Sequence, residues 1–127
     1  MTEAPADDGD EFSIPQQPYR EFTPDGRATM HDAVRFVLRP TEPIDSLSKP
    51  VRRVLESPRY TSIPWHGLPY PVLLVHDERT SSTFRVIILD DRLAFDVLPQ
   101  TTEAGLNGLY QAIAQHTGLA WSIERRE

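Results

Sequence analysis

The second half of the chain alternates short apolar runs with polar turns. Residues 71–76 form a continuous apolar run, which is typical of a strand buried on both faces. Residues 83–89 are rich in β-branched side chains, and apolar and polar positions alternate in residues 92–98, as in a half-buried strand. The polar residues 77–82 and the pair at 90–91 predict the two turns between these strands. The pattern predicts a three-stranded antiparallel meander.

A helix follows the meander. Thr101 or Thr102 can cap its start, and Gly118 can end it. Its apolar residues recur at helical spacing and form one stripe: Leu106, Leu109, Tyr110 and Ile113. Gly105 and Gly108 permit close approach either to this protein's own sheet, which we favour, or to a partner.

The segment before the meander is ambiguous. In residues 30–38 the apolar positions fit helical spacing, but Val34, Phe36 and Leu38 also alternate as in a strand. We favour the helix there. A second helix is expected after Ser48, which can cap it, and before Pro58, which ends it.

Together these elements predict an α+β fold, a small two-layer sandwich. Two short Pro-bounded elements precede the antiparallel three-stranded meander, and a helix and a closing strand follow it. In the closing strand Leu119, Trp121 and Ile123 alternate with polar residues. We expect a single α+β domain over residues 27–127 and an acidic, extended N-terminal arm over residues 1–26.

Charge separates the arm from the domain. Residues 1–26 hold seven acids and one base, a net charge of −6, whereas the remaining residues hold twelve of each. An acidic, Pro-punctuated segment is typical of a docking element, and few of its residues can form a core. We therefore expect the arm to bind a partner, through Asp7, Asp8, Asp10 and Glu11 above all, and to contribute little to the stability of the domain.

Composition excludes several functions. The chain has no cysteine, so disulfides, thiolate nucleophiles and Cys-based zinc sites are excluded. No apolar run is long enough to span a membrane, and no basic region followed by an apolar stretch opens the chain. We expect a cytoplasmic protein, or one built into a particle assembled inside the cell. The acidic balance argues against a nucleic-acid partner.

The sequence shows no catalytic or metal motif. The four histidines are scattered, and no phosphate-cradling loop, nucleophile elbow or dinucleotide fingerprint is present. The run His76-Asp77-Glu78 is a dense titratable cluster, but consecutive residues of a strand point to opposite faces. Asp91 and Asp96 would likewise lie on opposite faces of one strand. We expect no cofactor and no bound metal.

One loop is typical of a contact surface. Residues 60–71 place three aromatic residues and one histidine among three prolines, without regular periodicity: Tyr60, Trp65, His66 and Tyr70. Tyrosine and tryptophan anchor many interfaces, and prolines reduce the entropy lost on binding. The alternative is a lid over the protein's own core.

The segment from Arg27 to Arg59 is basic, with seven cations against four acids. The acidic arm could bind this segment in its own chain or in a neighbouring copy.

The leading hypothesis is a non-enzymatic assembly or adaptor protein that binds protein partners, itself included, as small components of phage particles do. The alternatives are an inhibitor or immunity-type protein that binds a basic target, and a small metal-dependent hydrolase that uses His76, Asp77 and Asp91.

Overall fold

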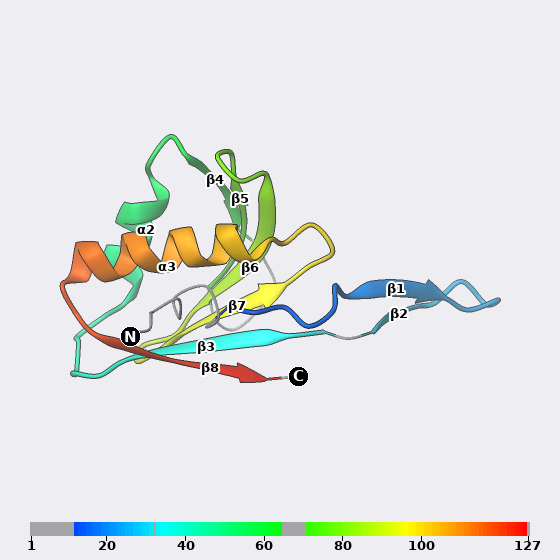
Figure 1. The fold of residues 1–127 in the computed structure, drawn as a ribbon, viewed down its shortest axis with the longest axis horizontal. Helices are drawn as coiled ribbons and strands as arrows, with labels where there is room; N and C mark the ends of the chain where they lie inside the picture. The colour runs from blue at the N-terminus through cyan, green and yellow to red at the C-terminus, as the bar shows by residue number, and fades with distance from the viewer. Residues whose placement is uncertain (1–11, 32, 65–70, 127) are drawn as a thin grey trace, which may run out of the picture.

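The computed structural model describes residues 12–31, 33–64 and 71–126. It is an α+β structure in which two helices cover one face of a six-stranded antiparallel sheet (Figure 1). The predicted α+β fold class is confirmed. In chain order the elements are β1 (Tyr19–Phe22), β2 (Ala28–His31), β3 (Arg35–Pro40), α2 (Ser48–Leu55), β4 (Tyr60–Pro64), β5 (Val72–Asp77), β6 (Ser82–Ile88), β7 (Leu93–Val97), α3 (Glu103–Thr117) and β8 (Trp121–Arg126).

The sheet contains the predicted meander at its centre. The strand order is β4-β5-β6-β7-β3-β8, so β5, β6 and β7 are consecutive neighbours. The early strand β3 lies between β7 and the closing strand β8, and it pairs with both in antiparallel register. The first and last thirds of the domain are therefore joined through one strand.

The helix favoured for residues 30–38 is wrong. This segment forms the end of β2 and most of β3. Phe36 and Leu38 point into the core beneath the helices, whereas Val37 faces the opposite side of the sheet and is also buried. A strand buried on both faces has apolar residues at consecutive positions, and such a run also fits helical spacing. The pairing with β7 and β8 decides between the two.

Helix α3 follows its sequence signals closely. Thr102 is the N-cap, and its hydroxyl accepts a hydrogen bond from the backbone N–H of Gly105 at 3.0 Å. Gly118 ends the helix in the left-handed conformation, with φ of 70°. Thr101 is not the cap. Its hydroxyl donates a hydrogen bond to the backbone carbonyl of Thr83 at 2.6 Å, which connects the start of the helix to β6.

Helix α2 begins at the expected place but is capped differently. Its N-cap is Leu47, which makes no side-chain capping bond, and not Ser48. Val51 and Leu55 turn inward and are buried. The helix ends at Leu55, three residues before Pro58.

The two glycines of α3 bring the helix close to this protein's own sheet, as favoured from the sequence. A Cβ atom at Gly105 would overlap the side chain of Ser82, at the start of β6. A Cβ atom at Gly108 would overlap the guanidinium group of Arg59. Both glycines therefore serve packing within the domain.

The predicted arm contributes a residue to the core. Phe12 is fully buried, with its ring centroid 5.2 Å from that of Phe36, 6.0 Å from that of Phe95 and 5.6 Å from that of Tyr110. Nearby, the carbonyl of Ser13 accepts a hydrogen bond from Arg125. The expectation that the arm adds little to the core does not hold at this position, because four aromatic rings from distant parts of the chain meet there.

The rest of the predicted arm leads into a hairpin. Strands β1 and β2 pair only with each other among the described residues, and they extend away from the body (Figure 1). Their turn is well built: the N–H groups of Thr23 and Gly26 close it at 2.9 Å, and Asp25 accepts hydrogen bonds from Thr23 and Arg27. Gly26 has φ of 89°, which favours glycine. The hairpin crosses the predicted boundary at residue 26.

The two edges of the sheet differ in charge. Edge strand β8 carries Glu124, Arg125 and Arg126, and charged side chains discourage pairing with a further strand. The other edge strand, β4, has no charged residue, and Ile63 on it is 57% exposed.

Phe12→Ala should lower the free energy of unfolding by about 3–5 kcal/mol, because it opens a cavity among three aromatic rings. The control is Phe22→Ala, where the parent side chain is 68% exposed and a change within about 0.5 kcal/mol is expected. Urea unfolding of both variants measures the difference. Equal stabilities would show that Phe12 is not part of the core.

Candidate interaction surfaces

Most of the partner-binding residues predicted from sequence lie outside the described residues. This holds for Trp65, His66 and Tyr70 in the aromatic loop, and for Asp7, Asp8, Asp10 and Glu11 in the arm.

Tyr60, the remaining residue of that set, begins β4 and is only 7% exposed. Burial raises the pKa of its phenol. The Arg59 guanidinium lies 5.2 Å from the centre of its ring. We assign Tyr60 to the core.

A buried ion pair joins β4 to β5. Arg59 donates from Nε and Nη2 to the two carboxylate oxygens of Asp77, at 2.7 and 2.9 Å, and Asp77 is fully buried. The same carboxylate accepts from the hydroxyl of Thr80 at 2.6 Å and from the N–H of Arg79 at 3.0 Å. Burial alone would raise the pKa of Asp77, but these hydrogen bonds hold it below its ordinary value. With these four hydrogen bonds, Asp77 holds the turn after β5 in place.

The residues of the hydrolase alternative are not brought together. The side chain of Asp77 lies in the helix-covered layer, whereas His76 faces the other side of the sheet, where its Nδ1 lies 2.8 Å from the hydroxyl of Thr83. Asp91 follows the opposite end of β6 from the end that pairs with His76 and Asp77. At the rise per residue of a strand, this places Asp91 about 20 Å from those two residues. Among the described residues, no group of three His, Asp or Glu side chains could hold a metal ion.

The face of the sheet opposite the helices carries a second ion-pair cluster. Asp96, 5% exposed, accepts from Nε of Arg35 at 2.6 Å and from Nη2 at 3.0 Å, and its Oδ2 also lies 3.0 Å from Nη2 of Arg85. Two clefts of about 340 and 360 Å³ lie beside this cluster and share Arg35 and Arg126. The cations here have carboxylate partners, as Arg126 has in Glu124. We assign the cluster a structural role.

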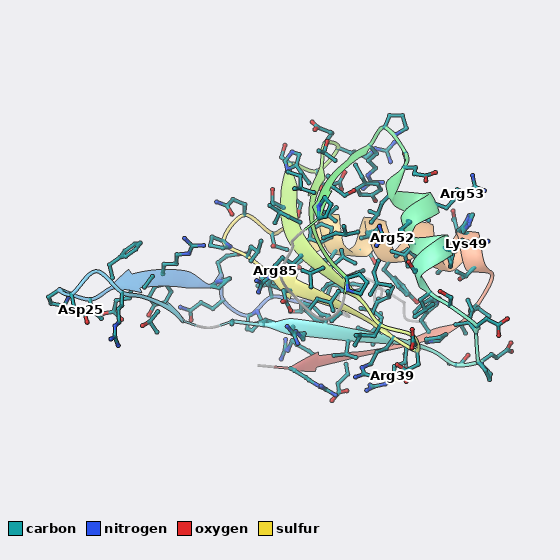
Figure 2. The ribbon with its side chains drawn as sticks, turned by 180° about the vertical axis from the view of Figure 1, so that it is seen from behind. Asp25, Arg39, Lys49, Arg52, Arg53 and Arg85 are labelled. Atoms are coloured by element: carbon teal, nitrogen blue, oxygen red, sulfur yellow. The ribbon has the colours of Figure 1, made fainter. Side chains whose placement is uncertain are left out.

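The structure divides the seven cations of the basic segment into two groups. Four form ion pairs: Arg27 with Asp25, Arg35 with Asp96, Arg39 with Glu124, and Arg59 with Asp77. The other three are exposed on α2 and form no ion pair with any described residue: Lys49, Arg52 and Arg53. Figure 2 shows these three together at α2, apart from Arg85 on the sheet. We call them the basic face of α2.

The projecting hairpin is a surface that the sequence reasoning missed. All four residues of β1 are exposed, with Tyr19 at 48% and Phe22 at 68%. Asp25, labelled in Figure 2, marks the tip. The available signal was the pair Asp25-Gly26 between two short runs, which is a common hairpin turn.

Comparison with protein-family models, with curated proteins and with solved structures finds no match to this chain. Within the described part of the chain, neither helix has the length and apolar character needed to cross a membrane.

Asp77→Asn should destabilise the protein by about 3 kcal/mol at pH 7, because Arg59 loses its buried counter-ion. The folded-state pKa of Asp77 is lowered, so its carboxylate stabilises the parent above its ordinary pKa of about 4 and loses this effect as the pH falls further. The asparagine of the variant has no carboxyl group to titrate. The difference in the free energy of unfolding between the parent and the variant should therefore become smaller below pH 4.

Urea unfolding between pH 7 and pH 2.5 measures this gap. Asp91→Asn is the control, because Asp91 forms an exposed pair with Arg92 and should have an effect below about 1 kcal/mol at every pH. A gap for Asp77→Asn that stays constant down to pH 2.5 would contradict the role given to this carboxylate.

Proposed function

We propose that this protein acts by binding other proteins, as an assembly or adaptor protein without catalytic activity, and that the hairpin β1–β2 is its main contact element. The observation that carries this proposal is the 68% exposure of Phe22 on a strand whose four residues all face solvent. A buried phenylalanine side chain is worth about 2–3 kcal/mol relative to an exposed one. Placing this one on a projecting hairpin forgoes that stabilisation unless a partner covers it.

The form of the hairpin supports the same proposal. A two-stranded hairpin is marginally stable alone in water and usually needs further packing. Here the turn at Asp25 and Gly26 fixes the hairpin's geometry through local hydrogen bonds. A preformed strand pair with exposed aromatic side chains loses little conformational entropy on binding. Aromatic residues also dominate the energetic centres of protein interfaces.

The buried charges support a binding role from another direction. Asp77 and Asp96 are each fully engaged by arginine side chains within the domain. Such pairs stabilise strand positions and hold no group ready to take a proton from a substrate. These two buried carboxylates therefore serve the fold.

Replacing Phe22 with a photo-crosslinking phenylalanine analogue should capture one discrete protein in the native cell, which mass spectrometry identifies. The same analogue at the exposed Asp90, at the far end of the meander, is the control and should capture none. With the identified protein in hand, Phe22→Ser should weaken the association about 30-fold, the effect of losing an interface anchor worth about 2 kcal/mol.

The melting temperature of Phe22→Ser should stay within about two degrees of the parent's, because the side chain is exposed. Undiminished binding by a folded Phe22→Ser variant would overturn the proposal. Capture of a second copy of this chain would identify the partner as the protein itself.

A further inference from the structure

The basic face of α2 differs from the other charged groups of the domain. Of the eight residues of this helix, three are cations and none is an acid. Lys49, Arg52 and Arg53 lie at i, i+3 and i+4, so they project from one side of the helix. Val51 and Leu55 occupy the buried side. Three positive charges that have no ion-pair partner among the described residues therefore lie side by side on an exposed surface.

The helix itself does not account for all three charges. Arg52 and Arg53 lie in the last turn, where cations interact favourably with the helix dipole. Lys49 lies in the first turn, where a cation is unfavourable and acids are preferred. The acids that flank the helix are Asp45, four residues before Lys49, and Glu56, directly after Leu55, and neither forms an ion pair with Lys49. An external carboxylate near Lys49 would remove this unfavourable term.

The rest of this chain supplies suitable carboxylates. Residues 1–11 contain Glu3, Asp7, Asp8, Asp10 and Glu11 and no basic side chain. A nucleic acid would also carry negative charge, but it would have to approach a protein with a net charge of −6. A short acidic peptide segment fits three cations better than a long polyanion does.

We propose that the basic face of α2 is a binding site for a short acidic polypeptide segment, and that residues 1–11 of the same chain occupy it in the free protein. This inference is independent of the hairpin.

The attachment point of the segment supports binding within one chain. Phe12 belongs to the same core cluster as Val51 and Leu55, so the segment starts on the side of the sheet that α2 covers. Eleven residues span up to about 36 Å when extended, and a domain of this size has a radius of gyration of about 13 Å. A tether this short gives an effective concentration in the millimolar range, above that of a second copy in dilute solution.

The site also gives the protein a built-in competitor. An acidic partner that binds α2 must displace the protein's own acidic segment. Its apparent affinity is lowered by the fraction of molecules in which the site is occupied. Both interactions involve exposed charges, so both weaken as salt shortens the screening length from about 10 Å at 0.1 M to about 3 Å at 1 M.

The single lysine makes a direct test feasible. A carbodiimide joins an amine to a carboxylate in contact with it, and the only primary amines of this chain are Lys49 and the amino terminus. In the full-length protein we expect a cross-link from Lys49 to Asp7, Asp8, Asp10 or Glu11, identified by peptide mass spectrometry. In a mixture of ¹⁵N-labelled and unlabelled protein, the linked peptides should come from one molecule.

Two variants test the recognition. Arg52→Gln with Arg53→Gln keeps Lys49 and should lower the cross-link yield about fivefold or more, because two of the three attracting charges are lost. Arg79→Gln with Arg126→Gln removes two exposed arginines outside α2 and the hairpin and should leave the yield unchanged. Lys49→Arg, which keeps the charge but offers no primary amine, should abolish the product.

Three results would overturn the proposal. The first is a cross-link between labelled and unlabelled molecules, and the second is a cross-link from Lys49 only to acids outside residues 1–11, such as Glu56 or Asp45. The third is a cross-link yield that stays the same when Arg52 and Arg53 are replaced. None of these results bears on the hairpin, because Phe22→Ser should leave the cross-link intact. Melting curves confirm that each variant is folded, as expected for substitutions at exposed positions.

Discussion

The carboxylate of Asp77 holds together the elements on which the rest of the domain is built. It fixes the guanidinium of Arg59 at the start of the edge strand, and it fixes the turn after β5 through Arg79 and Thr80. The arginine thus positioned occupies the space that Gly108 leaves on α3. One buried anion therefore positions the arginine against which α3 packs at Gly108. The turn that it stabilises includes Ser81 with φ of 54°, a left-handed conformation that costs about 1–2 kcal/mol without such support.

The aromatic group around Phe12 plays the corresponding part at the other end of the sheet. Phe36 comes from β3, Phe95 from β7, Tyr110 from α3, and Phe12 from the segment ahead of the hairpin. Because Phe12 is buried here, the chain is anchored to the core at this residue, between the acidic residues that precede it in sequence and the hairpin that follows. The hairpin leaves the body in one direction, and the acidic residues begin directly before the anchor. Both proposed contact elements are thus tied to one core residue.

The elements with local signals could be predicted from the sequence. Helix α3 has a cap, a stripe and a terminating glycine within 17 residues, and the meander alternates between runs and turns. Strand β3 could not be predicted, because an apolar run buried on both faces fits two periods equally well, and only its pairing with β7 and β8 decides. The burial of Phe12 could not be predicted for a similar reason. Nothing near it in the sequence indicates partners that are 24 to 98 residues away.

The candidate surfaces show the same limit. The sequence gives seven cations between Arg27 and Arg59 but not their ion pairs, because Asp96 and Glu124 lie 61 and 85 positions from their arginines. Only the fold separates the paired cations from the three on α2. The aromatic residues selected from the sequence included Tyr60, which is buried, and omitted Phe22, which is exposed. Aromatic composition identifies candidates for an interface, but burial depends on the tertiary structure.

The uncharged edge at β4 has a consequence for the behaviour of concentrated solutions. Among the described strands β4 pairs on one side only, so its other side and the exposed Ile63 can contact the same strand of another molecule, and no charge on the strand opposes this contact. The repulsion between molecules must come from elsewhere, and the surplus acids are in the first 26 residues. Near the isoelectric point of about 5.1 that repulsion disappears, and edge-to-edge contact is then unopposed. Residues 1–11 hold five of these acids, so they supply most of the repulsion, and a protein that begins at the buried Phe12 would have a net charge of −1 and its solubility minimum closer to neutral pH.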